Sequence, residues 1–98
     1  MPTQDHLMKT INDELCGSGY DLYYTNYYMD RYKKPVNNDH EADKEWYKLT
    51  LKLKRHGLVE DRKELTHSSC RVKIRHWTDL KLNGIRSFCI EIYWTDVN

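Results

Sequence analysis

The chain has 98 residues, of which 39% are hydrophobic and 32% are charged, and its formal net charge is +1. These values exclude a disordered or fibrous protein and predict a single globular domain spanning residues 1–98, large enough to bury a core without a disulfide or a metal. No apolar run is long enough for a transmembrane helix, and the N-terminus lacks the basic-then-apolar pattern of a signal peptide. We therefore expect a cytoplasmic protein that does not act at a membrane.

The chain is expected to open with an amphipathic helix over residues 4 to 16. Its apolar residues recur at spacings of three and four on one face: Leu7, Met8, Ile11 and Leu15. Thr3 suits the N-cap, and Gly17 or Gly19 can adopt the left-handed conformation that ends a helix.

The next segment, residues 20 to 32, is rich in tyrosine and free of glycine and proline. This composition predicts one strand with aromatic rings on both faces, Tyr23 and Tyr27 lying on the second face. Residues 33 to 43 contain Pro35 and lack apolar periodicity, so they predict a loop. The acidic residues of this loop are a secondary candidate for contact with a partner: Asp39, Glu41 and Asp43.

Two later segments, residues 45 to 55 and 70 to 77, alternate apolar and cationic side chains. Side chains on a strand point to opposite faces with a period of two, so both segments predict half-buried strands. The apolar positions expected to face the N-terminal helix are Leu49, Leu51, Leu53, Val72 and Ile74. The opposite positions would place six cations on one open face: Lys48, Lys52, Lys54, Arg71, Lys73 and Arg75.

Asn83-Gly84 is a strong hairpin signal between the strand at 70–77 and a last strand. A two-residue loop would put Val72 and Ile74 on the face opposite to Ile90 and Ile92, because a slip of one residue reverses every side chain. We therefore expect a three-residue loop or a bulge near Thr78, either of which would pair Ile74 with Trp94.

Together these elements predict the α+β class, with an N-terminal helix packed on one face of a four-stranded, mainly antiparallel β-sheet in the order α-β-β-β-β. No second helix of sufficient length for a parallel crossover is expected.

Sites for metal or nucleophilic catalysis are weakly indicated. His67 and Cys70 form a single ligand pair, whereas a tetrahedral zinc site normally has two. Three cysteines and five histidines offer accidental Cys-His pairs, but no catalytic signature accompanies them. We therefore predict no metal, no cofactor and no enzymatic activity, and a metal- or thiol-dependent enzyme is the weakest of the functions considered.

The open face is the leading candidate for a binding surface. Four aromatic residues would accompany its six cations: Tyr23, Tyr27, Trp77 and Tyr93. Interleaved aromatic and basic side chains hold single-stranded nucleic acid, and Tyr, Trp and Arg are also enriched in protein interfaces. A solvated sheet surface is the plain alternative.

The function favoured by this composition is a small interaction protein that binds stoichiometrically. In size and composition it is similar to phage- or virus-encoded inhibitors, for example those of the anti-CRISPR type. Such an inhibitor would sterically block a host protein that handles nucleic acid, and it would act in the host cytosol. The alternative is a module that binds single-stranded DNA or RNA with the same face.

Overall fold

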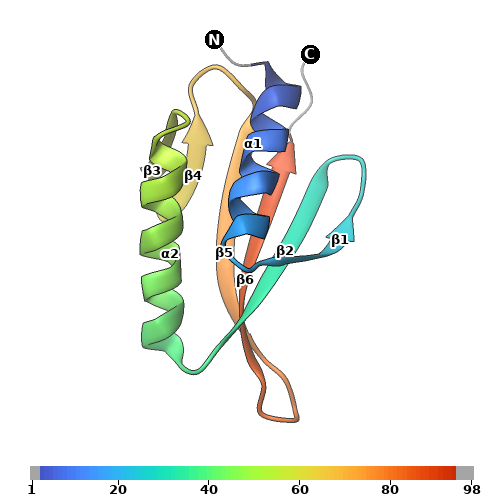
Figure 1. Ribbon diagram of the computed structural model, residues 1–98, viewed down its shortest axis with the longest axis vertical. Coiled ribbons are helices and arrows are strands. Elements are labelled where there is room, and N and C mark those ends of the chain that lie inside the picture. The colour runs from blue at the N-terminus through green and yellow to red at the C-terminus, as the bar shows by residue number, and fades with distance from the viewer. Residues whose placement is uncertain (1–2, 95–98) are drawn as a thin grey trace.

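The computed structural model describes residues 3 to 94, which form two helices lying side by side on one face of a six-stranded antiparallel sheet (Figure 1). The elements follow one another as α1 (Gln4–Gly17), β1 (Asp21–Thr25), β2 (Met29–Val36), α2 (Asp39–Lys54), β3 (Leu58–Asp61), β4 (Glu64–His67), β5 (Val72–Leu80) and β6 (Arg86–Trp94). The spatial order of the strands is β1-β2-β6-β5-β4-β3. The fold is α+β, but the predicted four-stranded sheet with one N-terminal helix is wrong.

Helix α1 agrees with its prediction. The Thr3 side chain accepts a hydrogen bond from the His6 backbone N–H at 3.1 Å, as an N-cap should. Leu7, Ile11 and Leu15 are each at most 1% exposed, because the helical period brings all three against the sheet.

Helix α2 occupies all but the last residue of the segment 45–55 that was predicted as a strand, and its first turns occupy the end of the predicted loop 33–43. Asn38 caps it by accepting a hydrogen bond from the Glu41 backbone N–H at 2.8 Å. Trp46, Leu49 and Leu53 are buried at spacings of three and four, whereas Leu51 is 46% exposed. The alternation of leucines fitted a period of two, but Trp46, Leu49 and Leu53 fit the helical period, and their packing in the core decides for the helix.

The predicted strand at residues 20 to 32 is a hairpin instead. The Asn26 side chain accepts a hydrogen bond from the Tyr28 backbone N–H at 2.8 Å, and the Asn26 backbone N–H donates to the Met29 carbonyl at 2.8 Å. Asparagine can close a turn through its side chain without glycine or proline, so the absence of those residues was misleading. The chain therefore reverses between β1 and β2, and β2 extends to Val36.

The β5–β6 hairpin has the predicted three-residue loop. Lys81 N–H donates to the Ile85 carbonyl at 2.9 Å around residues 82 to 84, and Gly84 closes the loop with φ at 84°. Ile74 pairs with Ile92 rather than with Trp94. The predicted partner of Ile74 is therefore wrong by two residues. A register shift of two residues leaves every side chain on the same face of the sheet, so the apolar side chains of both β5 and β6 lie under the helices.

The core lies between the helices and the sheet face that they cover. Its largest fully buried side chains from the sheet include Tyr32, Ile74, Phe88, Ile90 and Ile92. Neither helix within residues 3–94 combines the length and apolarity needed to cross a bilayer.

Candidate functional site

The sheet face opposite the helices, called the open face below, carries ordered rows of side chains across β2, β6 and β5. One row joins Lys33, Cys89 and Trp77, and the next joins Arg31, Glu91 and Arg75. A third joins Met29, Tyr93 and Lys73. Directly opposed residues of antiparallel strands have their Cβ atoms about 5 Å apart, so the side chains within each row are in reach of one another.

The central strand β6 is buried on this face although no helix covers it. Cys89 is 3% exposed and Glu91 is 6% exposed. Side chains of the neighbouring strands flank them: Arg31 of β2 bonds to Glu91, and Lys33 of β2 and Trp77 of β5 lie on either side of Cys89 in its row. Such side chains can cover a strand with their hydrocarbon parts while their polar ends stay in water. The open face is therefore a packed layer of amphipathic side chains.

Arg31 is the centre of this layer. Its Nε donates to Glu91 Oε2 at 2.9 Å, and its guanidinium carbon lies 5.2 Å from the Tyr24 ring centroid and 5.9 Å from that of Trp77. The hydrogen bond to Glu91 raises the pKa of Arg31 above its ordinary value. One buried carboxylate thus fixes a cation between two aromatic rings.

The other cations of the open face have similar partners. Lys33 Nζ lies 5.2 Å from the Tyr23 ring centroid, and the Arg75 guanidinium lies 5.3 Å from that of Tyr93. Arg75 Nε also donates to Glu64 at 3.1 Å. Cations and rings therefore alternate across the surface and hold one another in place.

The buried thiol on this face is poorly suited to nucleophilic catalysis. Burial raises the pKa of Cys89, and the nearby carboxylate of Asp79 raises it further. A protonated thiol is a weak nucleophile and a weak metal ligand. No group of three or more His, Cys, Asp or Glu side chains between residues 3 and 94 is arranged to hold a metal ion.

The structure divides the predicted binding residues into three groups. Five of them gather on the open face: Tyr23, Lys73, Arg75, Trp77 and Tyr93. Lys48, Lys52 and Lys54 belong to α2 and lie on the other side of the sheet, so the predicted face of six cations is wrong. The cause is the helical period of residues 39 to 54, which carries these lysines away from the strands.

Two predicted residues lie at the margins of the open face. Tyr27 is 87% exposed in the turn between β1 and β2, and Arg71 is exposed just before β5.

The predicted acidic loop is a helix terminus. Asp39, Glu41 and Asp43 fall in the first turns of α2, where carboxylates are stabilised by the positive end of the helix dipole. Glu41 also accepts a hydrogen bond from the Asn37 backbone N–H at 2.9 Å, and Asp39 pairs with Arg86. These contacts give the cluster a structural role that its sequence did not reveal.

The charge of the open face is nearly balanced. Strand register places four cations on it, namely Arg31, Lys33, Lys73 and Arg75. The same register places five carboxylates there, namely Asp21, Asp61, Glu64, Asp79 and Glu91. The surplus of positive charge predicted for this face is therefore absent from its strands within residues 3–94.

Sequence reasoning missed Tyr24, Arg31, Lys33 and Glu91. Arg31 and Lys33 were assigned to the end of a strand and to a loop, and the turn at Asn26 is the signal that would have placed them on β2. Glu91 lies between Ile90 and Ile92, and an acid flanked by two core residues at the centre of the last strand could have indicated a buried ion pair.

Comparison of the chain with protein-family models, with curated proteins and with solved structures finds no match.

Proposed function

We propose that the protein acts by stoichiometric binding and that the open face is the surface with which it docks another protein. The single observation that carries this proposal is the layer centred on Arg31. Tyr23, Tyr24 and Trp77 are 36 to 44% exposed in this layer. Their rings lie against the cations of Arg31 and Lys33, and the buried carboxylate of Glu91 orients Arg31. A surface that is already ordered loses less conformational entropy when a partner binds.

The residue types of the open face are those of interface hot spots. Tyr, Trp and Arg are enriched among the few residues that dominate the binding energy of protein complexes, and such residues are surrounded by contacts that exclude water. The β5–β6 hairpin projects beyond the ends of the helices (Figure 1), and its exposed apolar residues Leu82 and Ile85 extend the candidate surface.

The charge pattern favours a protein over a nucleic acid as the partner. Nonspecific binding of a polyanion depends on a surplus of cations that neutralise phosphates, and the strands of the open face carry four cations against five carboxylates. Stacking of bases needs accessible ring faces, and cations lie over the rings of Tyr23, Tyr24 and Tyr93.

Within this proposal, the protein is a cytoplasmic inhibitor that covers a surface needed by a nucleic-acid-handling protein. The support for that partner class is compositional: small size, no catalytic signature and a Tyr-rich, charge-mixed surface. An inhibitor encoded by a phage or virus, of the anti-CRISPR type, is the form of this proposal that the sequence favours.

A module that binds single-stranded DNA or RNA is the second candidate. Tyr27 favours it, because its ring is 87% exposed at the end of the β1–β2 hairpin, where a base could stack on it. Lys33 and Lys73 could then contact the phosphate backbone.

Affinity capture from nuclease-treated cell lysate with open-face variants tests the first candidate against the second. We expect the parent protein and Tyr47→Ala, which alters an exposed ring on α2, to retain a common protein at similar yield. Trp77→Ala should lose that protein, since a hot-spot aromatic costs about 2 kcal/mol or more when truncated. Circular dichroism establishes that both variants are folded.

Oligonucleotide binding supplies the opposite result. The binding constant of a labelled single strand is measured against salt concentration for the parent and for Tyr27→Ala. If log K falls against log salt with a slope of roughly −0.7 per phosphate contacted, and Tyr27→Ala binds more weakly, the nucleic-acid proposal would replace the protein-docking one. Equal capture by the Trp77 and Tyr47 variants would remove the open face as the docking surface.

A further inference from the structure

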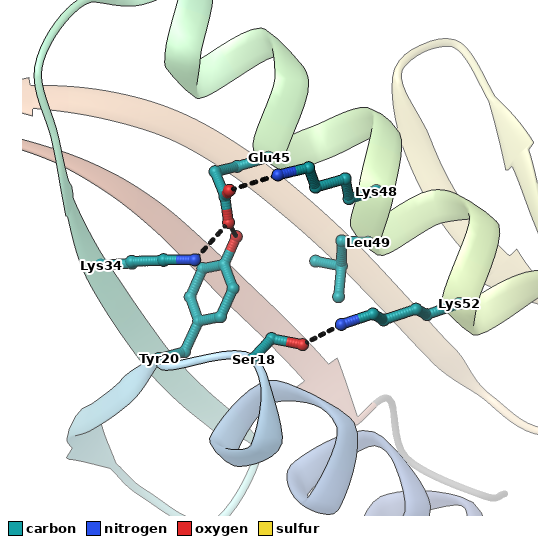
Figure 2. A pocket seen from close by; sticks show the side chains of 7 residues that line it. All are labelled: Ser18, Tyr20, Lys34, Glu45, Lys48, Leu49 and Lys52. Carbon is teal, nitrogen blue, oxygen red and sulfur yellow. Dashed lines mark hydrogen bonds and ion pairs between the residues drawn. The ribbon is translucent and has the colours of Figure 1, made fainter.

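A cavity of about 140 Å³ lies between α2, β2 and the segment that follows α1, away from the open face (Figure 2). We call it the lysine pocket, and its lining residues are Ser18, Tyr20, Lys34, Glu45, Lys48, Leu49 and Lys52. Lys34 reaches in from β2, Lys48 and Lys52 from α2, and Ser18 and Tyr20 from below, as Figure 2 shows. Three ammonium groups therefore converge on one small space.

One buried carboxylate compensates part of this charge. Glu45 is 8% exposed, and its Oε1 and Oε2 lie 2.8 Å from Lys34 Nζ and 3.7 Å from Lys48 Nζ. The Tyr20 hydroxyl donates to the same carboxylate at 3.3 Å. Burial by itself would raise the pKa of Glu45, but the hydrogen bond and charge of Lys34 outweigh it and hold the pKa below its usual value. The carboxyl is therefore ionised at neutral pH and neutralises one ammonium group.

Lys52 has a neutral partner. Its Nζ donates to Ser18 Oγ at 2.6 Å, and within residues 3–94 no carboxylate forms an ion pair with it. Because the Ser18 oxygen is the acceptor in this bond, its own hydroxyl hydrogen can be donated into the pocket. The pocket thus combines two uncompensated positive charges with a hydroxyl donor.

This donor set fits a phosphate group. Lysine binds phosphate as a compact point charge, and hydroxyl groups add directional hydrogen bonds to its oxygens. A dianionic phosphate would balance the two remaining positive charges. Lys44 lies one turn before Lys48 on the same stripe of α2 and lines an adjoining depression with it, where Glu41 and Glu45 supply two carboxylates, so the surplus of cations is confined to the lysine pocket. We propose that the lysine pocket binds the phosphate of a small ligand, either inorganic phosphate or a phosphomonoester.

The test is isothermal titration of the full chain with inorganic phosphate, adenosine 5′-monophosphate and adenosine at constant ionic strength. Binding of both phosphate-containing compounds but not of adenosine is the expected result. Tighter binding of the monophosphate than of inorganic phosphate would identify a phosphomonoester as the ligand. Amide resonances of Ser18, Tyr20 and Lys34 should shift in parallel in NMR spectra.

The phosphate affinities of charge variants distinguish a pocket that binds an anion from a group of ion pairs that only stabilises the fold. Lys52→Gln should weaken phosphate binding about tenfold, as expected when a hydrogen bond from a charged donor is lost. Lys54→Gln removes an exposed lysine of the same helix that does not line the pocket, and it should leave the affinity unchanged. Glu45→Gln should tighten binding, because it removes the anion that competes for Lys34 and Lys48.

Three results would overturn the proposal. They are an absence of phosphate binding by the parent, equal losses in the Lys52 and Lys54 variants, and weaker binding by a folded Glu45→Gln variant. If Glu45→Gln does not fold, Lys48→Gln decides in its place, because the Lys48 side chain is 67% exposed and its replacement preserves the core. Lys48→Gln should then weaken phosphate binding as Lys52→Gln does, and an unchanged affinity would reject the pocket as a phosphate site.

Discussion

The two faces of the sheet bury their central strands by different means. On the covered face, Ile90 belongs to one buried cluster with Leu49 and Leu53 of α2, whose side chains are hydrocarbon alone. On the open face, Arg31 and the rings beside it cover Cys89 and Glu91 with side chains whose charged ends stay in solvent. Burial by a helix can therefore use purely apolar side chains, whereas burial by neighbouring strand residues requires amphipathic ones. The second arrangement leaves an ordered surface that another molecule can contact.

The largest effect is expected on the covered face. Leu49→Ala should lower the free energy of unfolding by about 2–5 kcal/mol, because it leaves a cavity between α2 and the sheet. Leu51→Ala, the same substitution two residues later, should cost less than about 1 kcal/mol, since Leu51 is 46% exposed. Urea unfolding of both variants measures the difference. Similar costs at the two positions would contradict the helical assignment of residues 39 to 54.

The open face should be less sensitive to a single change. Glu91→Gln removes the charge that orients Arg31, and we expect a loss of about 1 kcal/mol in the free energy of unfolding, because the Arg31 side chain is 37% exposed and solvent screens the pair. Glu64→Gln, at an acid that is 31% exposed beside Arg75, is the matched control and should cost about half as much or less. A loss of several kcal/mol at Glu91 would make this face a second core rather than a preorganised surface.

The smallest effect concerns pH. His76 stacks on Trp46 under α2, with ring centroids 3.9 Å apart, and burial lowers its pKa, against the opposing influence of Glu60 and Asp43. A histidine with a lowered folded-state pKa binds fewer protons in the folded protein than in the unfolded chain. Its contribution is therefore complete above pH 6.5, the ordinary value, and is lost as the pH falls through the folded-state pKa.

His76→Phe should flatten the dependence of unfolding free energy on pH below 6.5. Thermal or urea unfolding in a series of buffers between pH 5 and 7.5 provides the measurement. An unchanged slope in the His76 variant would show that this ring titrates alike in the folded and unfolded states.

Local sequence patterns were sufficient to predict an element where a single hydrophobic period fitted the segment and nearby capping or turn residues defined its ends. Helix α1 followed from Thr3 and the spacing of Leu7, Ile11 and Leu15. The three-residue loop of the β5–β6 hairpin followed from the need to bring Ile74 and Ile92 to one face. Trp77 and Tyr93 share the open face as expected, because side chains alternate along β5 and β6. Tyr23 lies there too, but so does the adjacent Tyr24, because the register of β1 shifts between Leu22 and Tyr24.

Other parts of the structure depended on contacts between distant segments. The sequence by itself determined the α+β class, helix α1 and the apolar face of β5 and β6. Leucines at positions 49, 51 and 53 are compatible with both a strand and a helix, and packing of Trp46 and Leu49 against the sheet decides between them. Only the tertiary structure joined Arg31 to Glu91 and Lys34 to Glu45, partners 60 and 11 residues apart, because pairing of buried charges depends on which strands and helices become neighbours.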